Sequence, residues 1–335
     1  MKKLRVAILG VTGAVGQEFL SVLEERKFPI AELRLLASRK SAGKKIKFRG
    51  KFYKIEEAKP SSFDGTDLVL ASAGAKVSRI LSPEAVKRGA LVVDNSSAFR
   101  MDPRVPLVIP EVNPGDVRKN KGIIANPNCS TIIMAVPLYP LHRVARARRI
   151  VVSTYQAASG AGMQAMRELE KQTQEILSGK KPTKRIFRHQ IAFNLFSHDS
   201  AVRDDGFTEE EFKMIQETRK IFGAPRLKIV PTTIRVPVLR AHSESLVVEF
   251  EKPLSENEAH KILKKAPGVE VVDRRHDNYF PMPVDASGKD KVLVGRIRKD
   301  PSSENGLAFF VSGDQLRKGA ALNAVQIAEL LFKKH

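Results

Sequence analysis

The sequence predicts an α/β protein in which a doubly wound parallel sheet is followed by a second, α+β domain. The length of 335 residues is enough for two domains at roughly 150 residues each. In the first 127 residues short apolar runs alternate with helical patterns, which is typical of parallel strands joined by right-handed crossovers. Farther along, strands follow one another through short connections. We therefore expect one domain over 1–127, completed by a C-terminal helix over 314–335, and a second over 128–313.

The composition is that of a globular protein. Hydrophobic residues make up 42% and charged residues 28%, which excludes a wholly disordered or collagen-like chain. The single cysteine excludes an intramolecular disulfide and a multi-cysteine metal site, and we expect no metal. The longest apolar stretch, 131–141, contains two prolines and is too short to span a membrane, and no clear signal peptide precedes it. We expect a soluble, cytoplasmic protein without a membrane partner.

The chain is strongly basic, with 58 Lys and Arg against 37 Asp and Glu and a formal net charge of +21. Such a charge favours anionic partners. The basic residues gather at 44–51, 143–149 and 180–188, and no regular series of aromatic residues interrupts them. With only 6% aromatic residues and no Trp, a base-stacking surface is hard to assemble. We interpret the clusters as solvated surface and expect no nucleic-acid partner.

In the first domain each predicted strand is a short apolar run. These runs cover residues 4–9, 32–37, 67–71 and 90–93. The first strand is followed by a helix that places Phe19, Leu20 and Leu23 on one face. A second helix over 77–88 is expected to break or restart at Pro83, because proline lacks the backbone N–H that a helix interior needs.

In the second domain helices and strands are marked by their caps and periodicity. A strand ends over 153–157, and a helical pattern runs over 162–177. Thr208 with Glu211, and Ser255 with Glu258, are capping boxes and predict helix starts. Further strands are expected over 229–236, 245–250, 291–297 and 307–312. A last helix carries an apolar stripe made of Leu316, Ala320, Ala324, Ile327 and Leu331.

Three glycines follow the first strand and open the first helix. Gly10, Gly13 and Gly16 form a strand–turn–helix of the Rossmann type, in which glycine lets the backbone approach a pyrophosphate and the helix N-terminus supplies free N–H groups. The spacing is GxxGxxG rather than GxGxxG, so a tight turn without a ligand is the alternative. We predict a dinucleotide site.

The end of the second strand indicates which dinucleotide binds. NAD-selective sites usually carry Asp or Glu there, whereas this chain has Ser38 and Arg39. A guanidinium with hydroxyl neighbours suits a 2′-phosphate, which favours NADP. The alternative is that Arg39 merely belongs to the adjacent basic run.

The single cysteine lies where a nucleophile could be activated. Pro127 ends an extended segment, so Cys129 should sit in the first turn of the following helix, where the dipole lowers a thiol pKa. The Asn128 amide could stabilise a developing oxyanion. A cysteine of unknown context is more often a small buried hydrophobe, but the polar residues around it argue against burial. We predict a reactive thiol.

A thiol nucleophile needs a base, and the chain has seven histidines: His142, His189, His198, His242, His260, His276 and His335. Spacing alone does not choose among them. His242 has the most suggestive setting, because Arg235 and Arg240 lie beside it near a strand end.

Several motifs occur together along the chain: TGAVG at 12–16, SSAFR at 96–100, IPEVN at 109–113, NPNCST at 126–131, QAASGAG at 156–162, and the ending SGDQLRKGAALNAVQIAELL at 312–331. With the Arg235-to-His242 spacing, this combination resembles the aspartate-β-semialdehyde dehydrogenase family over essentially the whole chain. The resemblance implies NADPH-dependent reductive dephosphorylation of L-aspartyl 4-phosphate to L-aspartate 4-semialdehyde, on the route to lysine, diaminopimelate, threonine and methionine. It also implies a homodimer, with a dimer of dimers as the larger alternative.

The resemblance further implies roles for individual residues. Cys129 is the nucleophile that forms a thioacyl intermediate, His242 the general acid/base, and Gln156 orients the substrate. Arg235 clamps the substrate α-carboxylate, and Glu210 meets the amino group. Arg100, Asn128 and Lys213 form the phosphate site. The cofactor contacts implied by the resemblance and the glycine turn are Gly10, Thr12, Gly13, Ala14, Val15, Gly16, Ser38, Arg39, Ser41, Ser159, Gly160 and Gln315.

Two other functions are alternatives. The sister reaction, N-acetyl-γ-glutamyl-phosphate reduction, shares the domain order, thiol and histidine. That family resembles NPGCY around its cysteine, whereas this chain has NPNCS, and its acetylated substrate needs no carboxylate such as Glu210. A non-enzymatic dinucleotide-binding regulator would use the positive charge to bind nucleic acid and would be indifferent to loss of the thiol.

Overall fold

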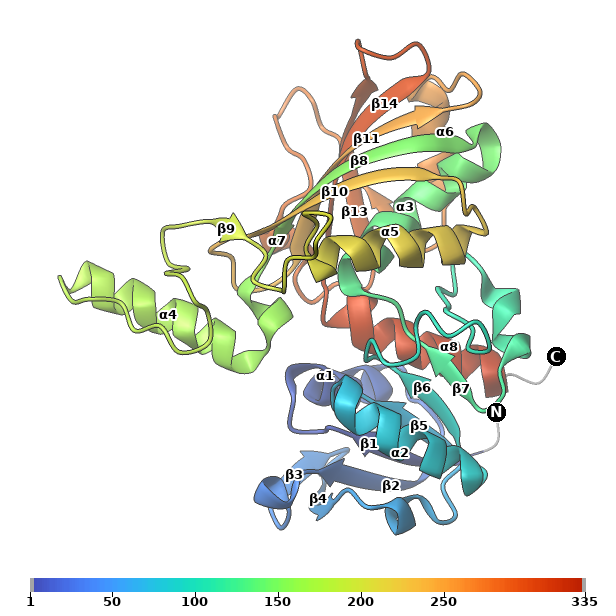
Figure 1. Cartoon of the computed structure of the whole chain (residues 1–335), viewed down its shortest axis with the longest axis vertical. Helices are drawn as coiled ribbons and strands as arrows, with labels where there is room; N and C mark the ends of the chain where they lie inside the picture. Colours follow the sequence, from blue (N-terminus) through green and yellow to red (C-terminus); the bar gives the residue numbers. More distant parts are fainter. Residues whose placement is uncertain (1–2, 333–335) are drawn as a thin grey trace. The chain divides into compact units, whose positions relative to one another are not determined.

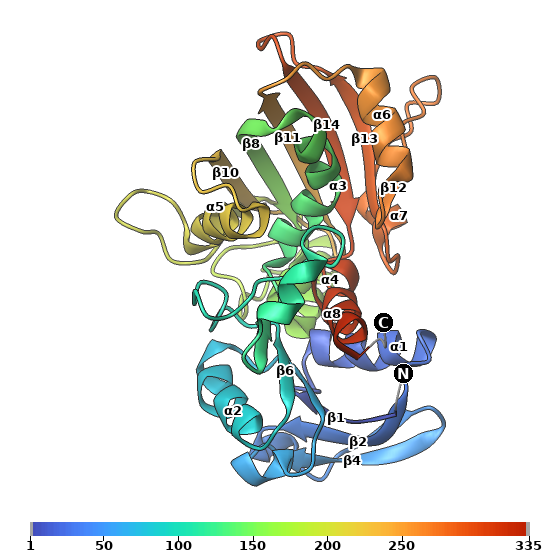
Figure 2. The same cartoon turned by 90° about the vertical axis from the view of Figure 1, so that its right-hand side faces the viewer.

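The computed structural model describes residues 3–332 and divides the chain into two compact units. One consists of the residues up to Asn128 together with those from Ala320 onward, and the other is Cys129–Gly319. Residues 314–319, which we expected to join the first domain, thus lie in the second unit. Figures 1 and 2 show the elements of each unit from two directions.

The first unit is built on a seven-stranded sheet with the order β3-β4-β2-β1-β5-β6-β7. All neighbours are parallel except the β3–β4 hairpin. The strands are β1 (Leu4–Leu9), β2 (Ile30–Ala37), β3 (Lys45–Phe48), β4 (Lys51–Glu57), β5 (Leu68–Ala71), β6 (Leu91–Asp94) and β7 (Ile123–Ala125). The sheet confirms the predicted doubly wound class.

Helices cover both faces of this sheet. Val6 and Ile8 of β1 pack with α1 (Ala14–Glu25) and α8 (Leu322–Phe332), whereas the alternate residues Ala7 and Leu9 belong to the core under α2 (Ala75–Lys87). This alternation follows from the two-residue repeat of a strand, which sends successive side chains to opposite faces. The short 3₁₀ turns η1 (Arg39–Ser41), η2 (Pro60–Phe63) and η3 (Pro114–Lys119) lie in the connections.

Of two local expectations for the first unit, the solvated basic run is confirmed and the break at Pro83 is wrong. The Lys and Arg residues of the run at 44–51 are exposed, and the run also forms β3 and the first residue of β4, with Ile46 and Phe48 packed toward the core between the lysines. Lysines on an edge strand also oppose pairing with another chain. In addition, α2 runs through Pro83 without restarting, since Leu81 and Ala85 on either side of it pack into the core.

The second unit has a mixed seven-stranded sheet with the order β12-β13-β14-β11-β8-β10-β9. The pairs β12–β13 and β8–β10 are parallel and the other neighbours are antiparallel. The strands are β8 (Ala147–Gln156), β9 (Phe196–Ser197), β10 (Lys228–Arg235), β11 (His242–Phe250), β12 (Val269–Val271), β13 (Val292–Lys299) and β14 (Gly306–Gly313). This unit matches the predicted α+β class.

Three helices pack on one face of the second sheet: α3 (Cys129–Ala145), α5 (Glu209–Phe222) and α6 (Glu256–Lys265), as Figure 2 shows. The capping boxes at Thr208 and Ser255 are present and start α5 and α6, as predicted. The helix α4 (Met163–Leu177) follows the 3₁₀ turn η4 (Ala158–Ala161). The short helix α7 (Pro283–Ala286) precedes β13.

The last predicted helix does not begin as a regular α-helix. Arg317–Ala321 form a π-type turn, η5, before α8. The carboxylate of Asp314 accepts hydrogen bonds from the backbone N–H groups of Leu316 and Arg317, and the Gly319 N–H donates to the Asp314 carbonyl, five residues back. These bonds replace the regular first turn.

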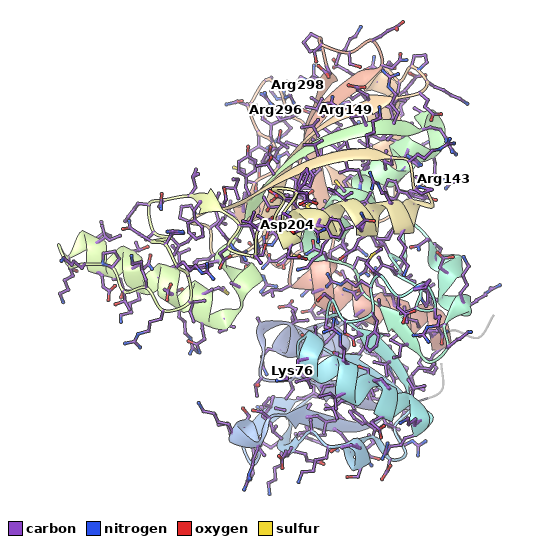
Figure 3. The ribbon with its side chains drawn as sticks, in the orientation of Figure 1. Lys76, Arg143, Arg149, Asp204, Arg296 and Arg298 are labelled. Carbon is purple, nitrogen blue, oxygen red and sulfur yellow. The ribbon has the colours of Figure 1, made fainter. Side chains whose placement is uncertain are left out.

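On the opposite face of the second sheet α7 packs beside β13, where Ala286 and Leu293 belong to one small core cluster. Tyr155 of β8, Val230 of β10 and Phe310 of β14 lie on this face, where Tyr155 is 37% and Val230 44% exposed. Arg149 and Arg296, labelled in Figure 3, are exposed, and each has a local partner: Glu249 for Arg149 and the Phe280 ring for Arg296. Within residues 3–332, every helix falls short of the length and apolar character that crossing a bilayer requires.

Candidate active site

The glycine turn of the first unit has the close packing that a dinucleotide site needs. Gly10 has a φ of 89°, and a Cβ on it would lie 2.7 Å from the Ser72 carbonyl oxygen. A Cβ on Gly16 would collide with the Gly10 carbonyl oxygen and with the Val11 backbone. A side chain on Gly16 would therefore push the first turn of α1 away from the end of β1, and one on Gly10 would displace the segment that follows β5.

A cavity of about 390 Å³ opens beside this turn within the first unit. Gly10, Thr12 and Gly13 line it together with Ser38 and Arg39. The structure thus brings the glycine turn and the end of β2 to one cavity, while Ala14, Val15, Gly16 and Ser41 are not among its lining residues.

Sequence reasoning missed two polar residues of the same cavity, Glu57 and Ser72. Glu57 is the last residue of β4, which pairs with β2. Its position therefore depends on the β3–β4 hairpin, which the basic sequence at 44–51 does not indicate. Its carboxylate forms an ion pair with Lys59 at 3.0 Å. Lys59 thus partly neutralises the acidic charge of Glu57, which lines the same cavity as Arg39.

In the second unit, Cys129 is the first residue of α3 and is half-buried. The η5 turn passes directly beside it, since a Cβ on Gly319 would lie 3.0 Å from the Cys129 Cβ. Glycine at this position lets the backbone approach the thiol-bearing residue. The position agrees with the predicted first turn of a helix.

Gln156, the last residue of β8, connects the start of α3 to the strand ends. Its Nε2 donates to Ser130 Oγ at 3.0 Å and to Thr154 Oγ1 at 3.3 Å. Its Oε1 accepts from Arg235 Nη1 at 3.5 Å. The side chain is 1% exposed. Three hydrogen-bond partners therefore hold Gln156, and one of them, Ser130, is the residue after Cys129.

His242 is the first residue of β11 and is fully buried. The Ala157 backbone N–H donates to its Nδ1 at 3.0 Å, so the neutral ring carries its proton on Nε2. Burial, with a smaller contribution from the Arg235 charge, lowers the pKa of His242 to about 3. Nε2 has no hydrogen-bond partner among the described residues. His242 is thus a neutral donor with a free N–H.

The residues around His242 fix its position. Ala241, which precedes it, has a φ of 72°, a rare conformation for a residue with a Cβ. The Ala241 N–H donates to Gln315 Oε1 at 2.9 Å, and Gln315 Nε2 bonds to Ser159 Oγ. Gly160 closes the site, because a Cβ there would lie 2.8 Å from Arg235 Nη1 and 3.1 Å from His242 Nε2.

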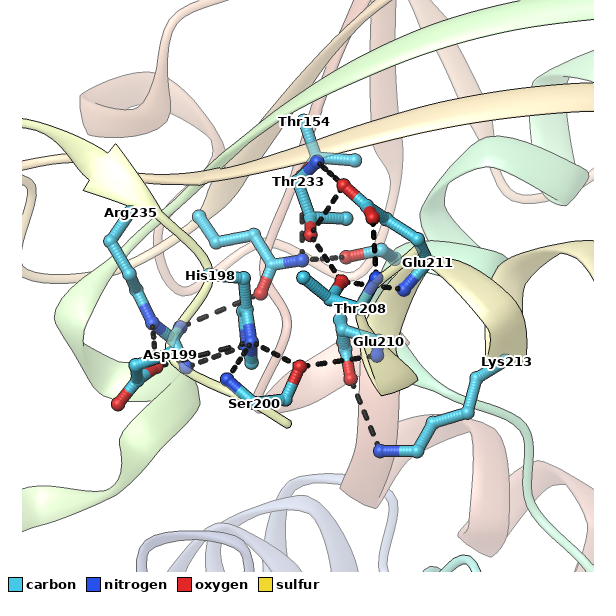
Figure 4. Close-up of polar contacts among 12 residues, drawn as sticks. Thr154, His198, Asp199, Ser200, Thr208, Glu210, Glu211, Lys213, Thr233 and Arg235 are labelled. Carbon is cyan, nitrogen blue, oxygen red and sulfur yellow. Dashed lines mark hydrogen bonds and ion pairs between the residues drawn. The ribbon is translucent and has the colours of Figure 1, made fainter. Parts of the chain in front are cut away.

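Arg235 ends β10 and is 4% exposed. Besides Gln156, its Nη1 donates to the Ala157 carbonyl at 3.3 Å. Its Nη2 lies 2.9 Å from His198 Nε2, and its Nε lies 3.5 Å from Asp199 Oδ1 (Figure 4). His198 and Asp199 were not predicted for the site. They follow β9, whose pairing with β10 brings them to Arg235, and nothing local in the sequence signals that pairing.

Glu210 and Lys213 lie one turn apart on α5, and Lys213 Nζ is 3.3 Å from Glu210 Oε2. The helix start is fixed to the sheet because Glu211 accepts from the Thr233 backbone N–H at 2.9 Å (Figure 4). Glu210 is 6% exposed. An ammonium and a carboxylate are thereby held at the N-terminal end of α5, which carries positive partial charge.

Arg100 and Asn128 belong to the first unit. Arg100 is 8% exposed and donates from Nε to the Asn126 carbonyl at 2.9 Å and from Nη2 to the Asn95 carbonyl at 2.8 Å. It is thus anchored on the segment that leads to Asn128.

Glu244 is a second buried ionisable group near the site. It lies two residues after His242 on β11 and is fully buried, and neither carboxylate oxygen has a hydrogen-bond partner among the described residues. Burial raises the pKa of Glu244 well above its usual value.

The described residues contain no cluster of three or more His, Cys, Asp and Glu side chains that could hold a metal ion. Three groups of predicted residues emerge. Gly10, Thr12, Gly13, Ser38 and Arg39 meet in the first unit, and Arg100 and Asn128 lie elsewhere in that unit. The second unit joins Gln156, Arg235, His242, Gly160, Ser159 and Gln315 through direct contacts.

Comparison with known proteins agrees with this arrangement. Residues 5–120 match the model of the semialdehyde dehydrogenase NAD binding domain, and residues 138–318 match the model of the semialdehyde dehydrogenase dimerisation domain. Fold and matches together define a semialdehyde dehydrogenase, a two-domain oxidoreductase that uses a dinucleotide.

Whole-chain relatives are more specific. The chain is 56% identical over 331 residues to aspartate-semialdehyde dehydrogenase of Synechocystis sp., covering 99% of this chain and 98% of the relative. It is 54% identical to the enzyme of Aquifex aeolicus, with 98% of each chain covered. The chain belongs to the aspartate-semialdehyde dehydrogenase family.

Solved structures show the same fold. Aspartate semialdehyde dehydrogenase II from Vibrio cholerae, complexed with ASA, superposes with a TM-score of 0.96 at 44% identity, covering 99% of this chain and 98% of that one. The Candida albicans enzyme with NADP gives a TM-score of 0.77 at 25% identity, with 98% of each chain covered.

Proposed function

We propose that this enzyme converts L-aspartyl 4-phosphate to L-aspartate 4-semialdehyde and inorganic phosphate with NADPH, as a step in amino-acid biosynthesis. Whole-chain identity to enzymes of this name supports the reaction. The observation that carries the mechanism is the buried chain of contacts from Ser130, next to Cys129, through Gln156 to Arg235, with His242 alongside.

Cys129 is the proposed nucleophile. Its sulfur attacks the acyl carbon of the substrate, the C–O bond to phosphate breaks, and a thioester forms on the sulfur. A thioester accepts hydride far more readily than a carboxylate does, which is the chemical reason for the covalent step. The position at the N-terminus of α3 favours the thiolate form.

His242 is the proposed acid/base residue. Its neutral ring keeps its proton on Nε2, which faces the space beside Gly160 and can donate a hydrogen bond to the oxygen that develops negative charge during reduction. When that oxygen reforms the carbonyl, the carbon–sulfur bond breaks, the sulfur leaves as a thiolate and the aldehyde is released. Gln156 orients the substrate beside the thiol.

The substrate's charged groups match the remaining residues. Arg235 presents a guanidinium that can bind the α-carboxylate, and Glu210 carries a carboxylate for the amino group. Lys213 and Arg100, with the Asn128 amide, are the proposed phosphate-binding groups, which stabilise the departing phosphate.

The first unit provides the proposed NADP site. The turn at Gly10 and Gly16 excludes any side chain, and the adjoining cavity ends at Ser38 and Arg39. Arg39 can pair with a 2′-phosphate, while Lys59 offsets the acidic charge of Glu57. Ala14, Val15 and Ser41 from the first unit, and Ser159, Gly160 and Gln315 from the second, are the other proposed contacts. When bound, NADPH supplies the hydride.

We further propose that the protein is a homodimer. The second unit matches a dimerisation-domain model, and one face of its sheet leaves Tyr155 and Val230 exposed beside a half-buried Phe310. Val230→Glu should shift the sedimentation-equilibrium mass toward that of a monomer. An unchanged mass would place the interface elsewhere.

A single assay tests the proposed reaction. NADPH formation is followed with L-aspartate 4-semialdehyde, phosphate and NADP, and repeated with Cys129→Ala. We expect turnover that the substitution reduces by at least about 10³-fold, since loss of a nucleophile removes the covalent route. Preference for N-acetyl-γ-glutamate semialdehyde, or full activity of Cys129→Ala, would overturn the proposal.

A further inference from the structure

The guanidinium of Arg235 is held from two sides, and the proposed chemistry does not use the residues on one of them, His198 and Asp199. Gln156 and the Ala157 carbonyl accept from Nη1, and the Phe187 ring lies 5.7 Å from Cζ. His198 and Asp199 contact the other side, at Nη2 and Nε. The side chain of His198 is only 11% exposed.

We propose that His198 is a positioning residue that makes carboxylate binding by Arg235 depend on pH. This inference rests on the proposed function, because it takes Arg235 as the group that binds the α-carboxylate of the substrate.

The hydrogen bonds around His198 determine which of its ring nitrogens carries the proton. Both ring nitrogens of His198 face a donor: Arg235 Nη2 lies 2.9 Å from Nε2, and the Ser200 backbone N–H lies 3.2 Å from Nδ1. A neutral imidazole accepts at only one nitrogen, and the shorter contact with the charged guanidinium, which can only donate, assigns the acceptor to Nε2. Nδ1 then carries the proton and can donate it to Ser200 Oγ, which lies 3.1 Å away. Ser200 Oγ in turn accepts from the Glu210 backbone N–H at 3.2 Å. One imidazole thus connects Arg235 to the start of α5 (Figure 4).

Protonation of His198 breaks this arrangement. The imidazolium has an N–H at Nε2, so the bond from Arg235 is lost and two positive groups face each other. Asp199 on the same segment and Glu210 of α5 favour the protonated form, whereas Arg235 of β10 and Lys213 of α5 oppose it; His242 of β11 also faces His198. Burial and the Arg235 charge together lower the pKa of His198 below its ordinary value near 6.5. At neutral pH His198 is therefore uncharged and Arg235 is held in place.

The consequence concerns substrate capture. As the pH falls through the pKa of His198, Arg235 loses a fixed partner, and KM for the carboxylate-bearing substrate rises. The maximal rate changes less with His198 than KM does, because His198 contacts the side chain that binds the carboxylate and not Cys129.

The test compares His198→Gln with His198→Leu. Gln keeps an acceptor for Arg235 but does not titrate, whereas Leu keeps the bulk and loses the acceptor. At about pH 7.5, His198→Leu should raise KM by roughly tenfold or more with kcat within about twofold, the effect of losing one hydrogen bond to a charged group. His198→Gln should keep a KM near that of the wild type.

The pH profile gives a second readout. Between about pH 7.5 and 5.5 the wild-type KM should rise more steeply than that of His198→Gln. An unchanged KM in His198→Leu, or the same KM profile in His198→Gln as in wild type, would overturn the inference. Cys129→Ala distinguishes failure of the proposed function from failure of this inference. If Cys129→Ala retains turnover, the proposed function fails. If Cys129→Ala is inactive and the His198 variants show no effect on KM, only the positioning role of His198 is rejected.

Discussion

The backbone N–H of Ala157 donates to Nδ1 of His242 at 3.0 Å, which fixes the proton of the neutral imidazole on Nε2. The same strand end presents Gln156, so Gln156 and His242, which we propose to orient the substrate and to donate to its oxygen, are connected through one peptide group. The ring of His242 is therefore oriented by the main chain next to Gln156 rather than by a flexible side chain.

Replacing His242 should reduce the rate without abolishing acylation. His242→Ala removes the Nε2–H donor, and kcat should fall by about 10²- to 10³-fold, the usual effect of losing one hydrogen-bond donor to a developing oxyanion. His242→Gln, which keeps an N–H donor in the region of Nε2, should lose less. Steady-state kinetics of both variants measure this order, and equal losses would contradict the donor role.

The buried neutral His242 should also make the fold sensitive to acid. Its pKa is about 3 in the folded state against an ordinary value of 6.5, so the unfolded chain binds more protons between these values. Its contribution to stability is present above about pH 6.5 and is lost as the pH falls toward 3. Urea unfolding at several pH values should show a smaller acid loss for His242→Gln than for wild type. If the free energy of unfolding depended on pH equally in wild type and His242→Gln, His242 would not have the lowered pKa in the folded state.

Glu244 should make the folded protein less stable at alkaline pH, whereas His242 makes it less stable in acid. Its pKa is raised in the folded state, so the folded protein favours the protonated carboxyl, and stability falls as the pH rises through that raised pKa. Glu244→Gln, a neutral residue of the same shape, should be more stable than wild type at alkaline pH. Glu249→Gln on the same strand, where Glu249 pairs with Arg149, is the control and should give no such gain. If the difference in stability between Glu244→Gln and wild type did not change with pH, Glu244 would not be the titrating group.

Much of this architecture could be predicted because its signals are local. The turn at Gly10, the capping box at Thr208 and the helix start at Cys129 each depend on residues within a few positions of one another. His198 could not be found in this way, because the pairing of Arg235 with Phe196 across β9 and β10 creates its contact. Glu57 was missed because its strand begins within a lysine-rich run whose alternating Ile46 and Phe48 we did not weigh.

Cofactor preference provides a prediction at Arg39. Arg39→Asp replaces the proposed partner of the 2′-phosphate with a repelling carboxylate that suits ribose hydroxyls, so the kcat/KM ratio of NADPH to NADH should fall strongly. Lys40→Asp makes the same charge change at the next exposed residue, which does not line the cavity, and should have a much smaller effect. Equal effects of the two changes would show that net charge, and not Arg39, selects the cofactor.

Arg235→Lys tests the carboxylate clamp. Lysine keeps the positive charge but loses the planar fork, so KM should rise by an amount equivalent to roughly 2–5 kcal/mol if the contact is fully buried. The matched control is Arg226→Lys, an exposed position between α5 and β10, where KM should not change. A KM for Arg235→Lys equal to that of wild type would argue against the clamp.

The proposed mechanism requires a covalent bond between the substrate and the sulfur of Cys129. Mixing the enzyme with L-aspartyl 4-phosphate without NADPH and measuring the intact mass should reveal one aspartyl group per chain, located on the Cys129 peptide and discharged when NADPH is added. An unmodified Cys129 under conditions in which the same preparation turns over would contradict the thioester mechanism.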